Sequence, residues 1–245
     1  MNVNLKKIVL IVDDEPDLLD VLAQRFELKG FNVFKADGGH AALKIFKSTP
    51  EINLVVSDIR MPEGDGLELL DRIREINIDI PVVFVTGYAD YVEAEIYHRG
   101  ANGIFSKPTG IKAMAEHAKN LLMPAVERWA ATPEKLNQSQ ISSKFSDLKQ
   151  SKTDKYFDLG RGGFYLRTAD KIPGLGEKLE FKIEFVSGDF LHITGSGIVR
   201  WIRLDPENSD FKICGIEFAY LIPEIRDQVV RWIKEQKIKP FIPLL

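Results

Sequence analysis

Short apolar runs alternate with amphipathic stretches along the first half of the chain. The runs cover residues 8–12, 54–57, 82–85 and 103–105. They are nearly continuous and rich in β-branched and aromatic residues, which is typical of strands buried on both faces of a parallel sheet. Between them, apolar residues recur near helical spacing, for example Leu18, Leu22 and Phe26. This alternation of strand and helix predicts a doubly wound α/β domain.

Five polar residues directly follow these runs: Asp13, Asp14, Asp58, Thr86 and Lys107. Ligands of doubly wound folds bind outside the carboxyl ends of the strands, so we expect these side chains to meet there. Three carboxylates in one crevice require a cation, and hard oxygen ligands select Mg²⁺ or a similar ion. With a hydroxyl and an ammonium beside them, the site suits a phosphoryl group. The chemistry predicted is phosphorylation of an aspartate.

Each of these residues also has a simpler interpretation when it is taken alone. Asp13 and Asp14 could cap a helix, because acidic residues and an early proline favour helix starts. Asp58 could be a turn residue, Thr86 an ordinary strand exit and Lys107 part of a loop. The joint order, spacing and strand context favour the phosphorylation site, because independent coincidences multiply.

Several motifs of the first half resemble the receiver domain of two-component response regulators. They are Val12-Asp13-Asp14-Glu15-Pro16, Ser57-Asp58-Ile59-Arg60-Met61-Pro62, Asp65-Gly66, Val85-Thr86-Gly87 and Phe105-Ser106-Lys107-Pro108. The resemblance implies a five-stranded receiver fold within residues 1–124, and a sensor histidine kinase that phosphorylates Asp58. It also implies that Asp13, Asp14 and Asp58 hold Mg²⁺ with the backbone carbonyl of Arg60, while Thr86 and Lys107 contact the phosphoryl group. The Lys107-Pro108 bond is expected to be cis, which is cheap only before proline.

The switch region departs from the receiver pattern. Receivers often carry an aromatic residue three positions before the lysine, but this chain has Ile104 there, with Phe105 beside it. Signalling could run through repacking of Ile104 and the surface of the last helix, or Tyr88 or Tyr91 could supply the mobile aromatic side chain. The sequence leaves both routes open. A homodimer through the last receiver helix is also consistent with the sequence.

The pattern changes after residue 124. Residues 125–154 predict a helical extension and then a polar linker rich in Ser, Gln and Lys, with a surface helix as the alternative. Residues 178–185 alternate between apolar and charged, as expected of a half-buried strand. With shorter runs at 163–166, 190–194, 197–202 and 213–218, they predict a small antiparallel β-barrel within residues 155–245. A C-terminal amphipathic helix around Ile225 and Val229 is predicted to cover its end.

The second half resembles PilZ domains, which are β-barrels that in many cases bind cyclic di-GMP. The stretch Asp158-Leu159-Gly160-Arg161-Gly162-Gly163-Phe164 is similar to their Asp-x-Ser-x-x-Gly turn, and residues 197–201 and 214–218 are similar to two of their strands. The resemblance implies a cyclic di-GMP site at these residues: Asp158, Gly160, Arg161, Gly163 and Arg200.

Both ligand motifs of the PilZ family are altered in this chain. Gly160 stands where the serine should be, although Asp158 and the neighbouring backbone donors remain. The upstream arginine pair is absent, and lysine cannot grip guanine and phosphate bidentately as arginine does. We expect the glycines of the turn to serve backbone conformation, because positive φ is cheap only for glycine.

Composition narrows the possible functions of the chain. From Ser151 onward there are fifteen Lys and Arg and fourteen Asp and Glu, which is too even for a DNA-binding surface. No apolar run is long enough to span a membrane and no signal-peptide core is visible, so we expect a cytoplasmic protein without membrane insertion. Cys214 is the only cysteine, which excludes disulfide scaffolds within one chain. The second half shows no catalytic cluster, so no enzyme is expected beyond self-catalysed phosphorylation and dephosphorylation of the aspartate.

Two hypotheses of different classes follow. In the first, the PilZ-like barrel is a protein-interaction module that passes the phosphorylation signal to a downstream protein, which the sequence does not identify. In the second, the barrel binds cyclic di-GMP and integrates this second messenger with phosphorylation.

Overall fold

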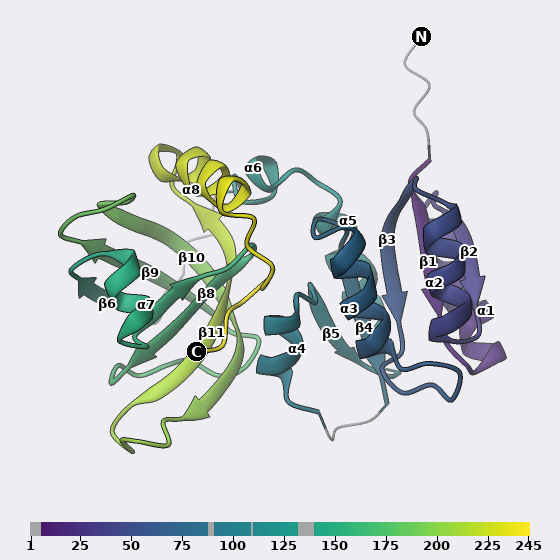
Figure 1. Ribbon diagram of the computed structural model, residues 1–245, viewed down its shortest axis with the longest axis horizontal. Coiled ribbons are helices and arrows are strands. Elements are labelled where there is room, and N and C mark those ends of the chain that lie inside the picture. The colour runs from purple at the N-terminus through teal and green to yellow at the C-terminus, as the bar shows by residue number, and fades with distance from the viewer. Residues whose placement is uncertain (1–5, 88–90, 109, 132–139) are drawn as a thin grey trace, which may run out of the picture. The chain divides into compact units, whose positions relative to one another are not determined.

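The computed structural model describes residues 6–87, 91–108, 110–131 and 140–245. The chain divides into two compact units, one within residues 1–92 and 99–122 and the other within residues 93–98 and 123–245. Figure 1 labels the helices and strands of both. The division falls within the short helix α4 (Glu93–Arg99), most of which groups with the second unit.

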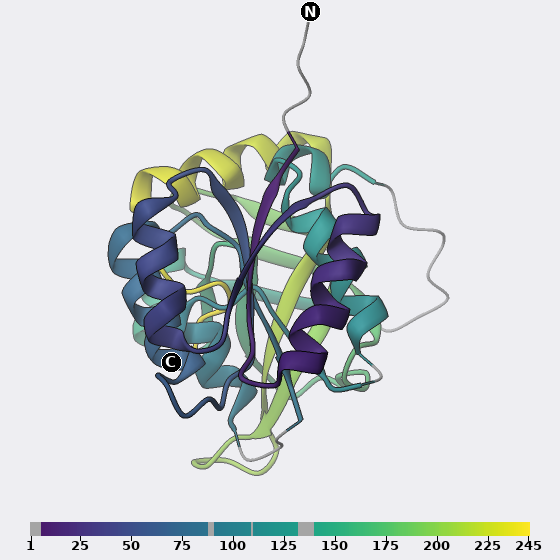
Figure 2. The same cartoon turned by 90° about the vertical axis from the view of Figure 1, so that its right-hand side faces the viewer.

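The first unit is built on a five-stranded parallel sheet with the strand order β2-β1-β3-β4-β5. The strands are β1 (Ile8–Val12), β2 (Asn32–Ala36), β3 (Ile52–Ser57), β4 (Val82–Thr86) and β5 (Gly103–Ser106). The remaining helices are α1 (Pro16–Leu28), α2 (Gly39–Ser48), α3 (Gly66–Ile76) and α5 (Ile111–Leu121). Helices α1 and α5 cover one face of the sheet, and α2 and α3 cover the other (Figures 1 and 2). The doubly wound α/β fold expected from the sequence is confirmed.

Burial within this sheet explains which strands the sequence pattern revealed. Val9, Leu10 and Ile11 of β1 have no exposed surface, because β1 lies between β2 and β3 and is covered by helices on both faces. Strand β2 lies at the edge and is largely exposed, so it carries only a weak apolar signal and was not among the predicted runs.

The second unit contains a curled six-stranded sheet with the order β6-β9-β10-β11-β8-β7. Its strands are β6 (Gln140–Phe145), β7 (Phe157–Leu159), β8 (Gly163–Thr168), β9 (Lys178–Phe185), β10 (His192–Leu204) and β11 (Lys212–Leu221). Strand β6 runs parallel to β9, and the other neighbours are antiparallel. The antiparallel pairing expected within residues 155–245 holds for every strand pair in that range. The parallel pair arises from β6, which lies before that range and was not among the predicted strands.

The short helix α6 (Ala125–Arg128) lies where the helical extension was expected. The rest of residues 125–154, expected to be a polar linker or a surface helix, contains the strand β6 and the helix α7 (Leu148–Thr153). Strand β6 is an edge strand in which Ile141 is fully buried while its neighbours face outward, and polar residues suit such an edge. Residues 132–139 of the expected linker lie outside the described residues.

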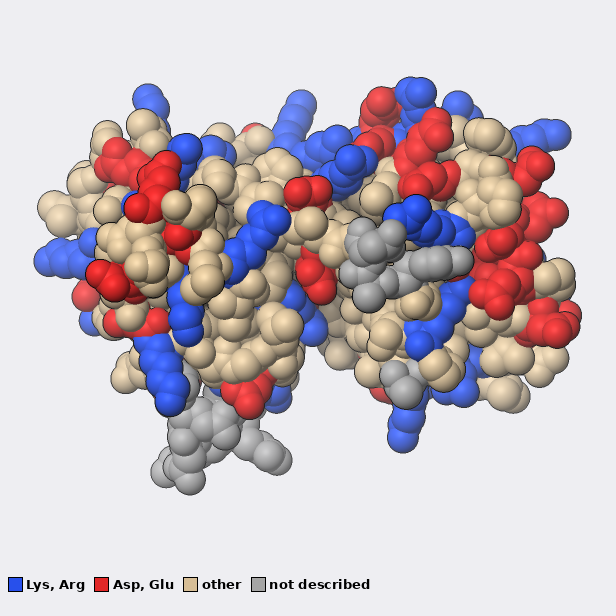
Figure 3. Space-filling model, turned by 90° about the horizontal axis from the view of Figure 1, so that it is seen from below, with Lys and Arg blue, Asp and Glu red and all other residues tan. Residues whose placement is uncertain are grey.

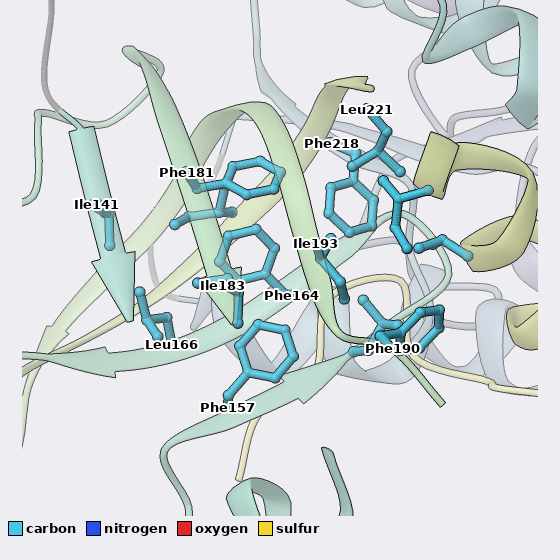
Figure 4. Packing of buried hydrophobic residues seen from close by; sticks show 14 of the residues in the cluster. Ile141, Phe157, Phe164, Leu166, Phe181, Ile183, Phe190, Ile193, Phe218 and Leu221 are labelled. Atoms are coloured by element: carbon cyan, nitrogen blue, oxygen red, sulfur yellow. The ribbon is translucent and has the colours of Figure 1, made fainter. Parts of the chain in front are cut away.

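The core of the second unit is rich in phenylalanine. Figure 4 shows Phe157, Phe164, Phe181 and Phe218 gathered between the strands, and the Phe164 and Phe181 rings meet edge to face with centroids 4.9 Å apart. Helix α8 (Pro223–Gln236) closes this core with one apolar face that includes Ile225, as the sequence predicted. None of the helices in the described part of the chain is long and apolar enough to cross a membrane.

Candidate functional site

The carboxyl edge of the parallel sheet brings the predicted polar residues together. Hydrogen bonding continues one residue past the strands, since Asp13 N donates to Ala36 O at 3.1 Å and Asp58 N donates to Val12 O at 2.9 Å. Thr86 ends β4 beside the end of β5, from which the chain continues into Lys107. Figure 3 views the molecule from this side and shows acidic side chains gathered over this unit.

Lys107 lies at the centre of the cluster. Its Nζ is 2.6 Å from Asp58 Oδ2, 2.9 Å from Asp13 Oδ2 and 3.2 Å from Glu15 Oε1. Asp13 and Asp58 are only 1% and 3% exposed, so their ion pairs with Lys107 are shielded from water, whereas Glu15 is exposed. The sequence analysis names Glu15 only as part of a motif and gives it no role in the site.

Burial and ion pairing shift the protonation equilibria in opposite directions. Burial raises the pKa of the Asp13 carboxyl above its ordinary value, and the neighbouring Lys107 ammonium offsets this only in part. Burial alone would lower the pKa of Lys107, but its hydrogen bond to Asp58 and its ion pair with Asp13 outweigh that effect and raise it. Lys107 therefore carries a fixed positive charge at neutral pH.

The same carboxylates are suited to hold a metal ion. Asp13, Asp14 and Asp58 each offer an oxygen atom, and these atoms all lie within 4.8 Å of one another. Asp13 Oδ2 is buried and accepts no hydrogen bond among the described residues, although the Lys107 ammonium is near. An all-oxygen donor set of this charge fits Mg²⁺. The carbonyl of Arg60 remains a predicted further ligand.

The loop after β3 fixes the orientation of Asp58. Ile59 N donates to Asp58 Oδ1 at 2.5 Å, and Gly66 N donates to Ile59 O at 2.8 Å, so the loop folds back on itself. A Cβ atom at Gly66 would lie 2.1 Å from Asp58 O, and only glycine permits this approach. Asp65 then begins α3 by accepting a hydrogen bond from Leu67 N at 2.6 Å.

Only some of the residues predicted to transmit the signal are described by the structure. Ile104 and Phe105 lie on β5 and are half-buried, and the Phe105 ring packs against His117 with centroids 5.5 Å apart. Tyr88 lies outside the described residues. The Lys107-Pro108 bond is cis, as expected. The signalling roles of these side chains remain predictions.

The turn between β7 and β8 carries most residues of the other predicted ligand site. Asp158 Oδ1 accepts a hydrogen bond from Leu159 N at 2.9 Å, and Asp158 Oδ2 pairs with Lys152 Nζ at 2.8 Å. Arg200 Nε lies 2.5 Å from Glu217 Oε2. Each of these charged side chains is thus paired within the second unit.

The expected reason for the glycines in this turn is wrong. None of Gly160, Gly162 and Gly163 has a positive φ. They are instead sites of close packing, and a Cβ atom at Gly163 would lie 2.0 Å from the backbone oxygen of Ile216 in β11. The expected backbone donors are also engaged, since Arg161 N donates to Pro240 O and Gly162 N to Phe241 O, both at 2.9 Å.

A pocket of about 410 Å³ opens beside Asp158. Its polar lining includes Lys149 and Lys152 from α7, and Trp232 from α8 forms part of its apolar lining. The indole N–H of Trp232 donates to Asp189 Oδ2 at 2.9 Å. The sequence interpretation had placed both lysines in a linker, so it could not have found this pocket.

Comparison with known proteins concerns the first half of the chain. Residues 9–119 match the family model of the response regulator receiver domain. Response regulator SaeR of Staphylococcus epidermidis is 32% identical over 116 residues, which cover 46% of this chain and 49% of SaeR. Sensor kinase CckA of Brucella abortus is 35% identical over 116 residues, covering 46% of this chain and 12% of CckA.

A solved structure matches a similar share of this chain. The receiver domain protein (CheY-like) of Methanospirillum hungatei is 30% identical, covers 48% of this chain and 94% of its own, and aligns with a TM-score of 0.44. The chain spans about half the length of SaeR and less of CckA. The family model ends at residue 119 and leaves the second sheet unmatched. On its sequence match and its carboxylate and lysine cluster, the segment 9–119 belongs to the response regulator receiver domain family.

Proposed function

We propose that this chain is a two-component response regulator that accepts a phosphoryl group on Asp58 from a sensor histidine kinase. One observation carries the proposal: Asp58 Oδ2 lies 2.6 Å from Lys107 Nζ, at the strand edge where Asp13 and Asp14 also converge. Three carboxylates, from Asp13, Glu15 and Asp58, share the one ammonium of Lys107. This excess of negative charge favours a cation and suits a phosphoryl group that arrives with one.

The residues of the site have distinct roles in this reaction. One carboxylate oxygen of Asp58 attacks phosphorus, the P–O bond to aspartate forms, and the P–N bond to the donor histidine breaks. Lys107 turns its hydrogen bonds from the carboxylates to the phosphoryl oxygens, and the Thr86 hydroxyl contacts the same group. Mg²⁺ held by Asp13, Asp14 and Asp58 would neutralise charge on the phosphoryl oxygens. Transfer to Asp58 and later hydrolysis are the only reactions proposed for this chain.

For the second unit we propose a role as a protein-interaction module rather than an enzyme. In the described residues the one group of three or more acidic, His or Cys side chains placed to hold a metal is the cluster around Asp58. The near balance of charge after Ser151 supports a protein partner over DNA. A homodimer through α5 is a further expectation, and sedimentation with and without beryllofluoride and Mg²⁺ tests it.

Cyclic di-GMP binding by the second unit is the second candidate function. The pocket beside Asp158 favours it, because Lys149 and Lys152 line this pocket and could meet phosphate. The pairing of Asp158 with Lys152, and of Arg200 with Glu217, weighs against it. Calorimetric titration of the full chain with cyclic di-GMP tests this candidate, and no heat with or without beryllofluoride would remove it.

Phosphorylation of the purified chain by labelled acetyl phosphate and Mg²⁺ tests the first function. We expect label on the wild type and none on Asp58→Asn, since the amide is no nucleophile here. Asp79→Asn is the matched control, because Asp79 is an exposed aspartate of the same unit. Equal labelling of Asp58→Asn and the wild type would show that the acceptor is another residue.

A further inference from the structure

A segment far along the chain covers the turn between β7 and β8. Residues 239–243, here called the 239–243 segment, follow α8 and form neither helix nor strand. Three successive carbonyl groups of this segment face the turn. Lys239 O accepts from Arg161 Nε at 3.0 Å, Pro240 O from Arg161 N at 2.9 Å and Phe241 O from Gly162 N at 2.9 Å.

The contact uses every backbone donor that the turn directs outward. Gly160 N donates within the turn to Gly163 O at 2.8 Å, which leaves the N–H groups of Arg161 and Gly162 for an external acceptor. Buried backbone donors need partners, and the 239–243 segment supplies both. The Arg161 guanidinium also lies over the Phe241 ring, 5.8 Å from its centroid.

The two glycines of the turn are explained by this contact. A Cβ atom at Gly162 would lie 2.0 Å from the Phe241 ring, and one at Gly160 would lie 2.5 Å from Phe241 O and 2.8 Å from Pro243 Cδ. Because neither glycine has a positive φ, the space taken by the segment, and not left-handed backbone, is what excludes a side chain. A serine at position 160 would collide with the segment.

We propose that the Gly160–Gly162 turn is a peptide-binding site that the chain's own 239–243 segment occupies, and that any other ligand of the turn must displace this segment. The site recognises a peptide through consecutive carbonyl groups and a proline followed by an aromatic ring. A protein partner with such a segment is the class of ligand that fits. The use of this site in signalling rests on the proposed interaction-module function, whereas its occupancy rests on the contacts alone.

Amide hydrogen exchange of the full chain, read by NMR at Arg161 and Gly162, tests the occupancy. We expect Gly160→Ser to raise exchange at both amides by about tenfold or more, since the serine expels the segment. Gly174→Ser is the matched control, because a Cβ there meets nothing closer than 3.4 Å. Equal exchange in Gly160→Ser and Gly174→Ser would overturn the proposal.

A labelled synthetic peptide of residues 237–245 tests the ligand class. Phe241→Ala weakens the bound segment but leaves the turn intact, so this variant should bind the peptide. The wild type should not bind it at micromolar concentration, since a tethered segment acts at an effective concentration on the order of mM. Gly160→Ser should not bind it either, because its site is blocked.

The outcomes separate this proposal from the proposed function. Peptide binding to Phe241→Ala alone supports the site, and absence of binding to all three proteins overturns it. Protection of the two amides in Phe241→Ala by cyclic di-GMP but not by the peptide would overturn the assigned ligand class. None of these measurements depends on phosphorylation of Asp58, so failure of Asp58 labelling would leave their result unchanged.

Discussion

Replacing Lys107 by glutamine should make the stability of the receiver domain depend on Mg²⁺. The substitution keeps a side chain of similar length but removes the ammonium that lies 2.6 Å from Asp58 and 2.9 Å from Asp13. Both carboxylates are almost fully buried, so they would be left facing each other without this cation. Removing one partner of a buried ion pair costs about 3 to 5 kcal/mol. Because the Lys107 side chain is 11% exposed and water can enter, we expect the lower end, about 3 kcal/mol.

Bound Mg²⁺ should restore part of the unfolding free energy that Lys107→Gln loses. At ten times its dissociation constant, an ion that binds only the folded state stabilises it by about 1.4 kcal/mol. Without Lys107 the carboxylates carry more uncompensated charge, so the ion should bind the variant more tightly and stabilise it more than the wild type. The variant should therefore be weakened most in EDTA and least in excess Mg²⁺.

Urea unfolding can follow the receiver domain separately. Trp129, Trp201 and Trp232 all lie in the second unit, so tryptophan fluorescence reports that unit while far-ultraviolet circular dichroism reports both. With a denaturant slope of about 1.5 kcal/mol/M, the receiver transition should shift by roughly 2 M urea in EDTA. Lys44→Gln, an exposed lysine on α2, is the control and should shift little. Unchanged midpoints for Lys107→Gln with and without Mg²⁺ would refute the electrostatic reasoning.

Three further predictions concern groups outside the cluster of Asp13, Asp58 and Lys107. Burial raises the pKa of the Cys214 thiol to about 12. At pH 8 iodoacetamide should therefore alkylate the native chain several hundred-fold more slowly than the urea-unfolded chain, and equal alkylation rates would contradict this prediction. Phe164→Ala should lower the unfolding free energy of the second unit by about 3 to 5 kcal/mol, read by tryptophan fluorescence, because its ring lies in the centre of the phenylalanine core. Arg74→Met should destabilise the receiver domain by about 2 to 4 kcal/mol in the circular dichroism transition. Arg74 donates to Gly100 O and Asn102 Oδ1, and the substitution removes these buried charge-assisted hydrogen bonds; an unchanged transition would contradict the prediction.

The receiver half shows where local pattern and a general rule of topology are sufficient. Continuous apolar runs mark the buried strands β1, β3, β4 and β5, and the rule that ligands meet at the carboxyl edge of a parallel sheet brings Asp58 and Lys107 together although they are 49 positions apart. What the pattern missed was weakly apolar, namely the exposed edge strand β2. Glu15 was missed because its reach to Lys107 depends on the conformation of an exposed side chain.

The sequence by itself determined the two classes of secondary structure, the carboxylate and lysine cluster around Asp58 and the altered turn at Gly160, since each follows from the order and spacing of residues along the chain. The tertiary structure decided the parallel pairing of β6 with β9 and the use of the turn's donors. Arg161 meets Lys239 across 78 positions, with no periodic pattern that relates the two. A backbone N–H has the same chemistry whether it faces a nucleotide, water or a distant peptide segment, so only the folded chain identifies its partner.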